Sequence, residues 1–406
     1  MRGWRITLGA GILWATLASA ALAAAPAALE QRIEAAVRSN AVAGAAVGVA
    51  VVDVETGALV FRKNAWRRLI PASNEKLYVT VAGFAALGAG FRYETRLVTD
   101  GAQEGRVLRG NLYLIGDGDP TLTRAQVAAL AASLRARGIR RIEGRVIGDE
   151  TVFDNRRYGP QWKRAYLGVE SPPLSALSVD RNVRDGQWTP NPARNAARVL
   201  RAELEERGVR VAQRLVGTRA APRDAEILAS AQSAPLWRIL RYMDHWSDNF
   251  TAEMVLKRVG VSAAGRGTTA GGVEAARALL GEYVPAESPK LVLVDGSGLS
   301  RANRSTASGF AQLLASVTRD ARVGPGVFGS LPVMGRDGTL RNRPANPAIR
   351  AKTGTLSDAS SLAGYAIGAS GARYAFAVLV NGRGGLNHWR AHAAQDAVAG
   401  AITRAG

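Results

Sequence analysis

Residues 46–54 read AVGVAVVDV, an apolar run rich in β-branched valine, and a shorter apolar run follows at residues 59–62. The turn-forming letters ETGA separate the two runs, so the pattern predicts a pair of strands. The far end of the chain repeats the pattern, because residues 362–369 and 372–381 are also apolar and are separated by Ser370-Gly371. Strands of this kind at both ends predict one antiparallel sheet that the two ends of the chain share.

Two helical patterns accompany these strands. Residues 29–39 have the apolar spacing of an amphipathic helix, and residues 387–403 close the chain as a second helix. Of the 406 residues, 47% are hydrophobic and 21% are charged, which is ordinary for a globular protein with a core. The predicted fold class is α/β in the α+β sense, with an antiparallel sheet flanked by helices.

The first residues have the pattern of a secretory signal peptide. Arg2 and Arg5 precede an apolar run at residues 6–17, and small residues follow up to Ala23. The run is shorter than the roughly 20 residues that a membrane-spanning helix needs, which favours cleavage near Ala23 over a retained anchor. We therefore expect an exported, periplasmic protein with at most peripheral membrane association.

The chain is strongly basic, with a formal net charge of +20, and it has no cysteine. The absence of cysteine fits an exported protein without disulfides and excludes thiolate chemistry. The basic residues are scattered singly, without the runs or aromatic interleaving of a nucleic-acid site, so no nucleic-acid partner is predicted. Attraction to an anionic cell wall or membrane surface, or a merely solvated surface, explains the charge better.

The middle of the chain changes to short strands and glycine turns from about Phe91. The sequence predicts a turn at residues 116–120, a helix at 124–137 and a strand at 141–149, and this module ends near Ser171-Pro172-Pro173. The predicted organisation is a signal peptide at residues 1–23, a discontinuous main domain at 24–90 and 174–406, and a small inserted α/β domain at 91–173.

Three short motifs occur once each, in the order Ser73-Asn74-Glu75-Lys76, Ser247-Asp248-Asn249 and Lys352-Thr353-Gly354. They supply a serine nucleophile and two lysines, but no histidine. A helix is predicted from Ser73 to Leu87, so Ser73 and Lys76 share one face of its first turn. The amides of that turn have no partner within the helix and can stabilise negative charge on a substrate oxygen. The third motif follows a strand-like segment, which predicts an edge strand beside the site.

Lysine is rare in this chain, which has 47 arginines and six lysines. Two given basic positions would both be lysine by chance in about one case in a hundred. A desolvated lysine ammonium can lose its proton whereas a guanidinium effectively cannot, so a general base or proton relay requires lysine. The rarity indicates that Lys76 and Lys352 serve chemistry.

Other catalytic constellations fit less well. A Ser-His-Asp triad would need His245, His388 or His392, and none of them accompanies a Gly-x-Ser-x-Gly elbow. His388 and His392 are four residues apart, as zinc ligands can be, but no acidic third ligand is evident and a solvated helix face is favoured. His245 is interpreted as a helix-end histidine that borders the cleft at most. No metal and no cofactor are predicted.

Each motif alone is weak evidence, but the three in this order are typical of penicillin-interacting serine enzymes. The chain resembles the class C low-molecular-mass penicillin-binding proteins, which are D-alanyl-D-alanine carboxypeptidases and endopeptidases. The resemblance runs from about Val47 to the C-terminus, and it includes a gap between the first two motifs that is too long for a β-lactamase. Further shared strings are GDGDPTL at residues 116–122, VDRN at 179–182 and DGSGLSR at 295–301. Family members often carry two nested insertions before the second motif, and we expect one of them to be missing here.

The resemblance implies a role for each motif residue. Ser73 would attack the carbonyl of the penultimate D-alanine, and Lys76 would take its proton. Ser247 would relay a proton to the leaving D-alanine, while Asn249 would hold the substrate amide and fix Lys76. The terminal carboxylate would be bound by the segment Lys352, Thr353, Gly354 and Thr355. Backbone N–H groups of Ser73 and Thr355 would form the oxyanion hole.

The resemblance also implies a second substrate, a cross-linked peptide whose diaminopimelate side chain lies near the inserted module. Asp149 could pair with its ammonium and Arg301 with its carboxylate, although a turn aspartate and a helix-capping arginine are equally open interpretations. We therefore predict a transpeptidase-like serine DD-peptidase that acts on peptidoglycan stem peptides and is acylated at Ser73 by β-lactams. The alternatives are a β-lactamase of the same fold and a non-catalytic wall-binding protein.

Overall fold

A six-stranded antiparallel sheet is built from both ends of the chain. The computed structural model describes residues 27–184, 186–287 and 290–404, so the predicted signal peptide lies outside the described residues. The strand order is β14-β15-β16-β17-β1-β2. The bounds are β1 (Ala46–Asp53), β2 (Leu59–Lys63), β14 (Val333–Met334), β15 (Asn346–Leu356), β16 (Ala359–Ile367) and β17 (Arg373–Asn381). Because β1 pairs with β17 in antiparallel register, the prediction of one shared sheet is confirmed.

Helices cover both faces of this sheet, as alternation along the strands requires. Val49 and Val51 point into one core with α10 (His388–Thr403) and the helix of residues 27–39. Ala50 and Val52 point into the opposite core, where α8 (Ala307–Val317) contacts β1 and β17. The two valine-rich strands at the ends of the sequence are therefore buried from both sides.

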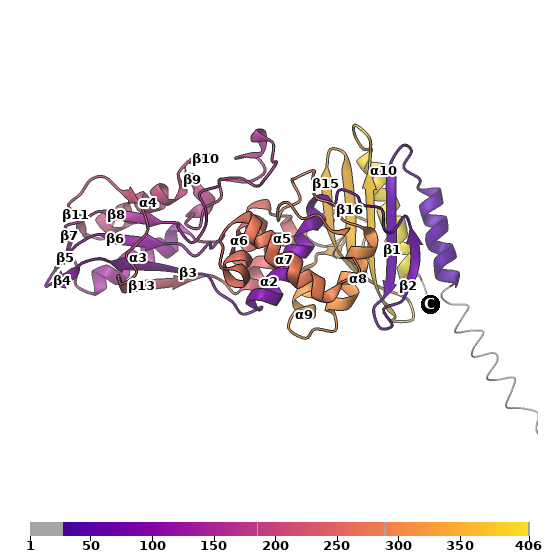
Figure 1. Cartoon of the computed structure of the whole chain (residues 1–406), viewed down its shortest axis with the longest axis horizontal. Coiled ribbons are helices and arrows are strands. Elements are labelled where there is room, and N and C mark those ends of the chain that lie inside the picture. Colours follow the sequence, from indigo (N-terminus) through magenta and orange to yellow (C-terminus); the bar gives the residue numbers. More distant parts are fainter. Residues whose placement is uncertain (1–26, 185, 288–289, 405–406) are drawn as a thin grey trace, which may run out of the picture.

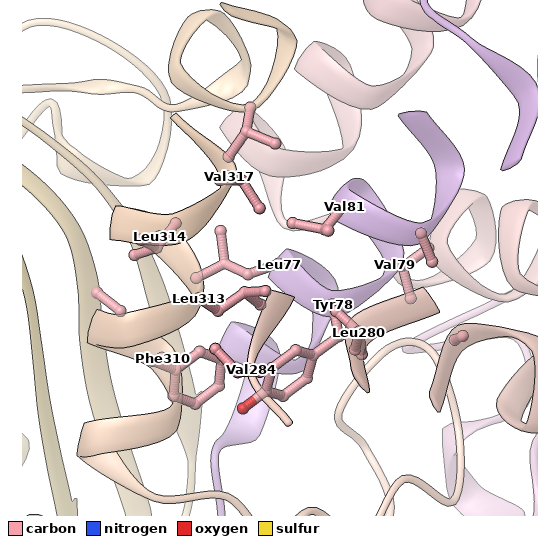
Figure 2. Close-up of a cluster of buried hydrophobic side chains, with 14 of the residues drawn as sticks. Leu77, Tyr78, Val79, Val81, Leu280, Val284, Phe310, Leu313, Leu314 and Val317 are labelled. Carbon is pink, nitrogen blue, oxygen red and sulfur yellow. The ribbon is translucent and has the colours of Figure 1, made fainter. Parts of the chain in front are cut away.

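A helical cluster lies between the sheet and the rest of the molecule (Figure 1). Its members besides α8 are α2 (Lys76–Leu87), α5 (Leu236–Trp246), α6 (Asn249–Ala264), α7 (Thr269–Tyr283) and α9 (Gly324–Ser330). Helix α2 runs through its middle, and Figure 2 shows Leu77 and Tyr78 among apolar side chains of α7 and α8. The rings of Tyr78 and Phe310 stack with centroids 4.6 Å apart. A helix buried on all sides in this way gives a catalytic serine at its start a rigid support.

The remaining sheets form a separate unit at the left of Figure 1. The largest has the order β12-β8-β6-β3-β13, the second has the order β11-β7-β5-β4, and β9 and β10 form a two-stranded third sheet. The bounds are β3 (Glu94–Thr99), β4 (Ala102–Glu104), β5 (Val107–Arg109), β6 (Leu112–Ile115), α3 (Arg124–Ala136), β7 (Arg141–Ile142), β8 (Val146–Asp149), β9 (Val183–Arg184), β10 (Gln187–Trp188), α4 (Pro192–Glu206), β11 (Arg210–Val211), β12 (Gly217–Thr218) and β13 (Glu226–Gln232).

The second half of this unit differs from the prediction. Residues 174–232 were expected in the main domain, but β11, β12 and β13 pair with β7, β8 and β3 respectively. The apolar face of α4, with Leu200 and Leu204, is buried against the same strands. The sequence pattern of such short strands does not reveal their pairing partners. The predicted end of the insertion, at residue 173, therefore came too early in the chain. Among the described residues no helix is both long and apolar enough to cross a membrane.

Candidate active site

Ser73 lies in a strained turn at the start of α2. The turn is the 3-10 segment η1 (Ala72–Glu75), so Ser73 precedes the first α-helical residue rather than being part of a continuous α-helix. Ala72 has a φ of 49°, in the left-handed region that a side chain disfavours. Gly298, with φ of 85°, approaches closely, since a Cβ there would lie 1.9 Å from the carbonyl oxygen of Ala72. Neighbouring backbone therefore holds the nucleophile turn in its unusual shape.

Lys76 is fully buried beneath Ser73. Its Nζ lies 3.0 Å from Ser73 Oγ, 2.8 Å from Asn249 Oδ1 and 2.6 Å from the carbonyl oxygen of Ser297. Burial lowers the pKa of Lys76 to about 8, although nearby carboxylates, Asp295 first among them, oppose the shift. The structure thus brings the predicted base into contact with the predicted nucleophile and with the second motif.

Buried acids surround this lysine. Glu75 is fully buried, and neither of its carboxylate oxygens has a hydrogen-bond partner. Burial, with Asp295 and Glu253 nearby, raises the pKa of Glu75 well above its usual value. Burial also raises the pKa of Glu253 to about 8, while its Oε1 accepts from the backbone of Gly296 and Ser297. Burial therefore favours the neutral form of Glu75, which adds no negative charge beside Lys76.

The third motif lies on β15 opposite the nucleophile turn. Strand β14 pairs with β15 only at Arg350 and Asn346, so the segment that follows has one open edge, as predicted for an edge strand. A side chain at Gly354 would meet Ser361 Oγ at 2.3 Å, Pro71 O at 2.8 Å and Asn74 N at 2.9 Å. Glycine is required there because the strand passes against the backbone that carries Ser73.

Lys352 links the third motif to the second. Its Nζ donates to Ser247 Oγ at 2.8 Å and to the carbonyl oxygen of Thr353 at 2.6 Å. Burial and the neighbouring Lys76 lower its pKa well below the usual value. Ser247 itself is in the left-handed conformation, with φ of 57°, at the end of α5. The turn from α5 into α6 therefore presents Ser247 and Asn249 to the two lysines.

Arg181 supports this turn from outside the three motifs, a role that the sequence did not reveal. Asp180, Arg181 and Asn182 are consecutive residues with positive φ. Their turn directs the Arg181 guanidinium onto Asp248 in a two-pronged contact of 2.8 and 3.1 Å, with Phe250 beneath the guanidinium. Asp248 in turn caps α6 through the Thr251 amide. The shared string VDRN drew attention to these residues, but it revealed neither their positive φ values nor the contact with Asp248.

These groups border one cavity of about 670 Å³. Among its lining residues are the predicted Ser73, Ser247, Asn249, Arg301, Thr353 and Thr355. Arg301 donates to Tyr166 Oη at 2.9 Å and Ser357 Oγ at 2.8 Å, and it forms an ion pair with Asp358 at 3.1 Å. Lys76 and Lys352 lie buried below the floor of the cavity. The structure therefore brings together every predicted site residue except one.

The exception is Asp149, at the end of β8. Its oxygens accept hydrogen bonds from Thr151 N at 2.9 Å and Ala221 N at 2.8 Å, and it is buried within the second unit. It is not among the residues that line the cavity. The arrangement matches the alternative interpretation of Asp149 as a turn aspartate.

Several lining residues were not predicted. Lys163, Tyr166 and Glu170 come from the segment between β8 and α4, and the Glu170 carbonyl oxygen accepts from Asn249 Nδ2 at 3.0 Å. Nothing in the sequence showed that this irregular segment returns to the site. The solvated helix face predicted for His388 and His392 is wrong, because both are partly buried and line the cavity. His245 lies in a different groove, on α5. No three potential ligands are grouped as a metal site in the described ranges.

A Ser-Lys pair, a Ser-x-Asn turn and a Lys-Thr-Gly strand that meet between an antiparallel sheet and a helical cluster define a penicillin-interacting serine peptidase. The chain belongs to the D-Ala-D-Ala carboxypeptidase 3 (S13) family, which matches residues 29–191 and 186–404. It is therefore a serine-type D-Ala-D-Ala carboxypeptidase, and the predicted family and enzyme class are confirmed.

Individual relatives agree with this assignment. The chain is 33% identical over 460 residues to a D-alanyl-D-alanine carboxypeptidase of Actinomadura sp. (strain R39), with 91% of this chain and 84% of the relative covered. The crystal structure of penicillin-binding protein 4 from Haemophilus influenzae has a TM-score of 0.81 and 22% identity, and it covers 91% of this chain and 99% of that one. A peptidoglycan endopeptidase structure from Bdellovibrio bacteriovorus has a TM-score of 0.54 and 17% identity, with 82% and 85% covered. The predicted fold class is confirmed.

Proposed function

We propose that Ser73 is the acylated nucleophile of this peptidase and that neutral Lys76 is its general base. The contact of 3.0 Å between Lys76 Nζ and Ser73 Oγ carries the proposal. A neutral amine has two N–H donors, which Asn249 Oδ1 and the Ser297 carbonyl would accept, so its lone pair points to the Ser73 hydroxyl. A pKa of about 8 keeps enough of the lysine neutral for this role.

In acylation, Ser73 Oγ bonds to the carbonyl carbon of the penultimate D-alanine while its proton passes to Lys76. The C–N bond to the terminal D-alanine then breaks, and Ser247 delivers a proton to the leaving nitrogen. The hydrogen bond from Lys352 to Ser247 supports this relay. Water then hydrolyses the ester and restores Ser73.

Binding of the substrate uses the open edge of β15. The terminal carboxylate lies against Thr353 and Thr355, above the buried Lys352, and the oxyanion accepts from the N–H groups of Ser73 and Thr355. Each such donor contributes about 3 to 4 kcal/mol to transition-state stabilisation in other serine enzymes. Arg301 is one of the lining cations that could meet a second carboxylate on the third residue of the stem peptide. Cleavage of D-Ala-diaminopimelate cross-links is the endopeptidase activity we propose beside carboxypeptidation.

Two further parts of the proposal concern where the protein is located and what inhibits it. A signal-peptide pattern at residues 1–23 supports export to the periplasm, where peptidoglycan is found. β-Lactams are proposed as covalent inhibitors that acylate Ser73, because their strained amide resembles D-Ala-D-Ala. The Haemophilus influenzae relative has been crystallised with a β-lactam.

The test is incubation of the purified protein with a fluorescent penicillin, followed for hours on a denaturing gel. We expect a persistent adduct that is lost in Ser73→Ala, together with release of D-alanine from a soluble pentapeptide. Rapid loss of the label with turnover would identify a β-lactamase instead. Absence of label from the folded wild-type protein would overturn the proposal and leave a non-catalytic wall-binding protein.

A further inference from the structure

The outer face of α5 carries an aromatic stripe, which consists of Trp237, Tyr242 and Trp246 with Arg238 and Arg241 between them. The three aromatic side chains are 42%, 46% and 53% exposed. The five positions span roughly 14 Å along the helix axis and cover about half of its circumference, with Trp237 and Trp246 at the two edges of the exposed face. The opposite face of α5 is buried in the core, so this helix is held rigidly with its aromatic rings facing outward.

The stripe borders a groove of about 300 Å³ and is flanked by positive charge. The Arg238 guanidinium lies 5.1 Å from the Trp237 ring centre, and that of Arg341 lies 5.9 Å from the Trp246 ring centre. Within the described residues, none of Arg238, Arg241 and Arg341 forms an ion pair with an acidic side chain. Exposed aromatic rings beside free guanidinium groups indicate an interaction surface.

The groove adjoins the active site through neighbouring residues of the chain. Trp246 is followed directly by Ser247, which lines the catalytic cavity. On the other side, a Cβ at Gly338 would lie 2.5 Å from the His245 carbonyl oxygen, and the next residue, Thr339, also lines the cavity. A polymer held at Ser73 therefore has the stripe close to its next repeat.

We propose that the aromatic stripe binds the glycan strand of peptidoglycan beside the stem peptide that is being cut. The proposal rests on the proposed function and adds a binding platform for the polymer to it. The apolar C–H faces of pyranose rings pack on aromatic rings, while guanidinium groups donate to sugar oxygens and pair with stem-peptide carboxylates. Peptidoglycan carries both features, and its next repeat is tethered to any peptide bound at Ser73.

An anionic bilayer is the other surface that matches aromatic rings and arginines. The glycan strand is favoured because the stripe adjoins the catalytic cavity, and the stem peptide proposed to bind in that cavity belongs to the same polymer. Binding to a bilayer would not require the stripe to lie beside Ser247.

The test compares Trp237→Ala and Tyr242→Ala, combined in one protein, with the wild type on two substrates. We expect kcat/KM on intact sacculi to fall about tenfold. Hydrolysis of a soluble pentapeptide and acylation by penicillin are expected to stay within about twofold, since neither substrate reaches the stripe. Trp66→Ala is the matched control, because Trp66 is also 42% exposed and lies under a guanidinium, that of Arg62 at 5.5 Å.

Co-sedimentation separates the possible partners. The wild-type protein should sediment with sacculi and with peptide-free glycan strands, and the double variant should do so several-fold less. Equal sedimentation of the two proteins with sacculi would overturn the proposal, as would binding that the variant loses only for phosphatidylglycerol vesicles. Because this binding needs no catalysis, failure of penicillin acylation would count against the proposed function alone.

Discussion

At the scale of single residues, the chemistry of the site depends on how burial shifts the pKa of each ionisable group. Lys76, Lys352 and Glu75 are all fully buried, and burial moves the pKa of each toward the neutral form. The two lysines could be predicted from their rarity among 47 arginines, because the reason for lysine is chemical. The role of Glu75 could not be predicted, because the sequence does not show whether a glutamate inside a motif is solvated or buried.

The pH dependence of acylation tests Lys76. The neutral form must react, so the second-order rate of penicillin acylation should rise about tenfold per pH unit below pH 8 and level off above it. Lys76→Arg should lower the rate by about 10² to 10⁴, since arginine cannot serve as a base at these pH values. Lys63→Arg, on the surface, is the control. A rate that does not change between pH 6 and 9 would contradict the assignment.

The stability of Glu75→Gln tests the buried acid. The folded state keeps its proton above the unfolded pKa of 4.5, so the wild type loses stability as pH rises, by about 1.4 kcal/mol per unit up to the folded pKa. Glutamine cannot ionise, so the free energy of unfolding of the variant, relative to wild type, should increase between pH 5 and 7.

Urea denaturation at the two pH values measures this difference. Glu30→Gln is the control, because Glu30 is exposed. A difference between Glu75→Gln and wild type that is the same at both pH values would mean that Glu75 is ionised in the folded protein.

At the scale of elements, the motifs work because three backbones approach one another. The order and chemistry of the motifs could be predicted, and so could the open edge of β15. Two turns could not be predicted: the 3-10 turn around Ser73 and the turn that carries Arg181. The positive φ values at Ala72 and Arg181 are imposed by residues packed around them rather than by residue type. The lining segment around Tyr166 was missed for a related reason, since it has no periodic pattern.

Gly354→Ala tests the approach of β15 to the nucleophile turn. The added methyl group overlaps Ser361 and the backbone of Pro71 and Asn74, so the strand or the turn must move by a fraction of an ångström or more. Acylation should fall about 10²-fold, as expected for a misplaced nucleophile, while the fold survives with a loss of about 1 to 3 kcal/mol. Gly90→Ala, where a Cβ meets nothing within 4 Å, is the control. Unchanged acylation in Gly354→Ala would show that the close approach is not needed.

At the scale of the whole molecule, the sequence predicted a sheet shared by both ends of the chain and an inserted unit, but it placed the end of that unit too early. The apolar strands at residues 46–54 and 372–381 are long enough to reveal their pairing by pattern. The two-residue strands β11 and β12 are too short for this, and their pairing partners are known only from the tertiary structure. The alignment with the Actinomadura enzyme spans 460 residues, more than the whole of this chain, so that relative has segments that this chain lacks.

Residues 92–234 are expected to fold without the rest of the protein. Their larger apolar core is formed within the segment, while Phe153, Leu174 and Ala176 form a smaller cluster with residues of α6. Strand β3 pairs with β13, which brings the two cut ends together. The isolated fragment should show a cooperative urea transition by circular dichroism. Leu200→Asp, which puts a charge at a fully buried position, should abolish that transition. A fragment without any cooperative transition would show that the unit depends on the catalytic part.

The pairing of β1 with β17 has a consequence for how the protein is made. Strand β17 lies between β16 and β1, so the N-terminal strands have no neighbour on that side until residue 381 has been synthesised. Because the inserted unit is complete by residue 232, it can form while the ribosome is still working, whereas the catalytic half must wait. A chain that ends before β17 cannot complete the sheet, so we expect hydrolytic activity only after this last strand has been made.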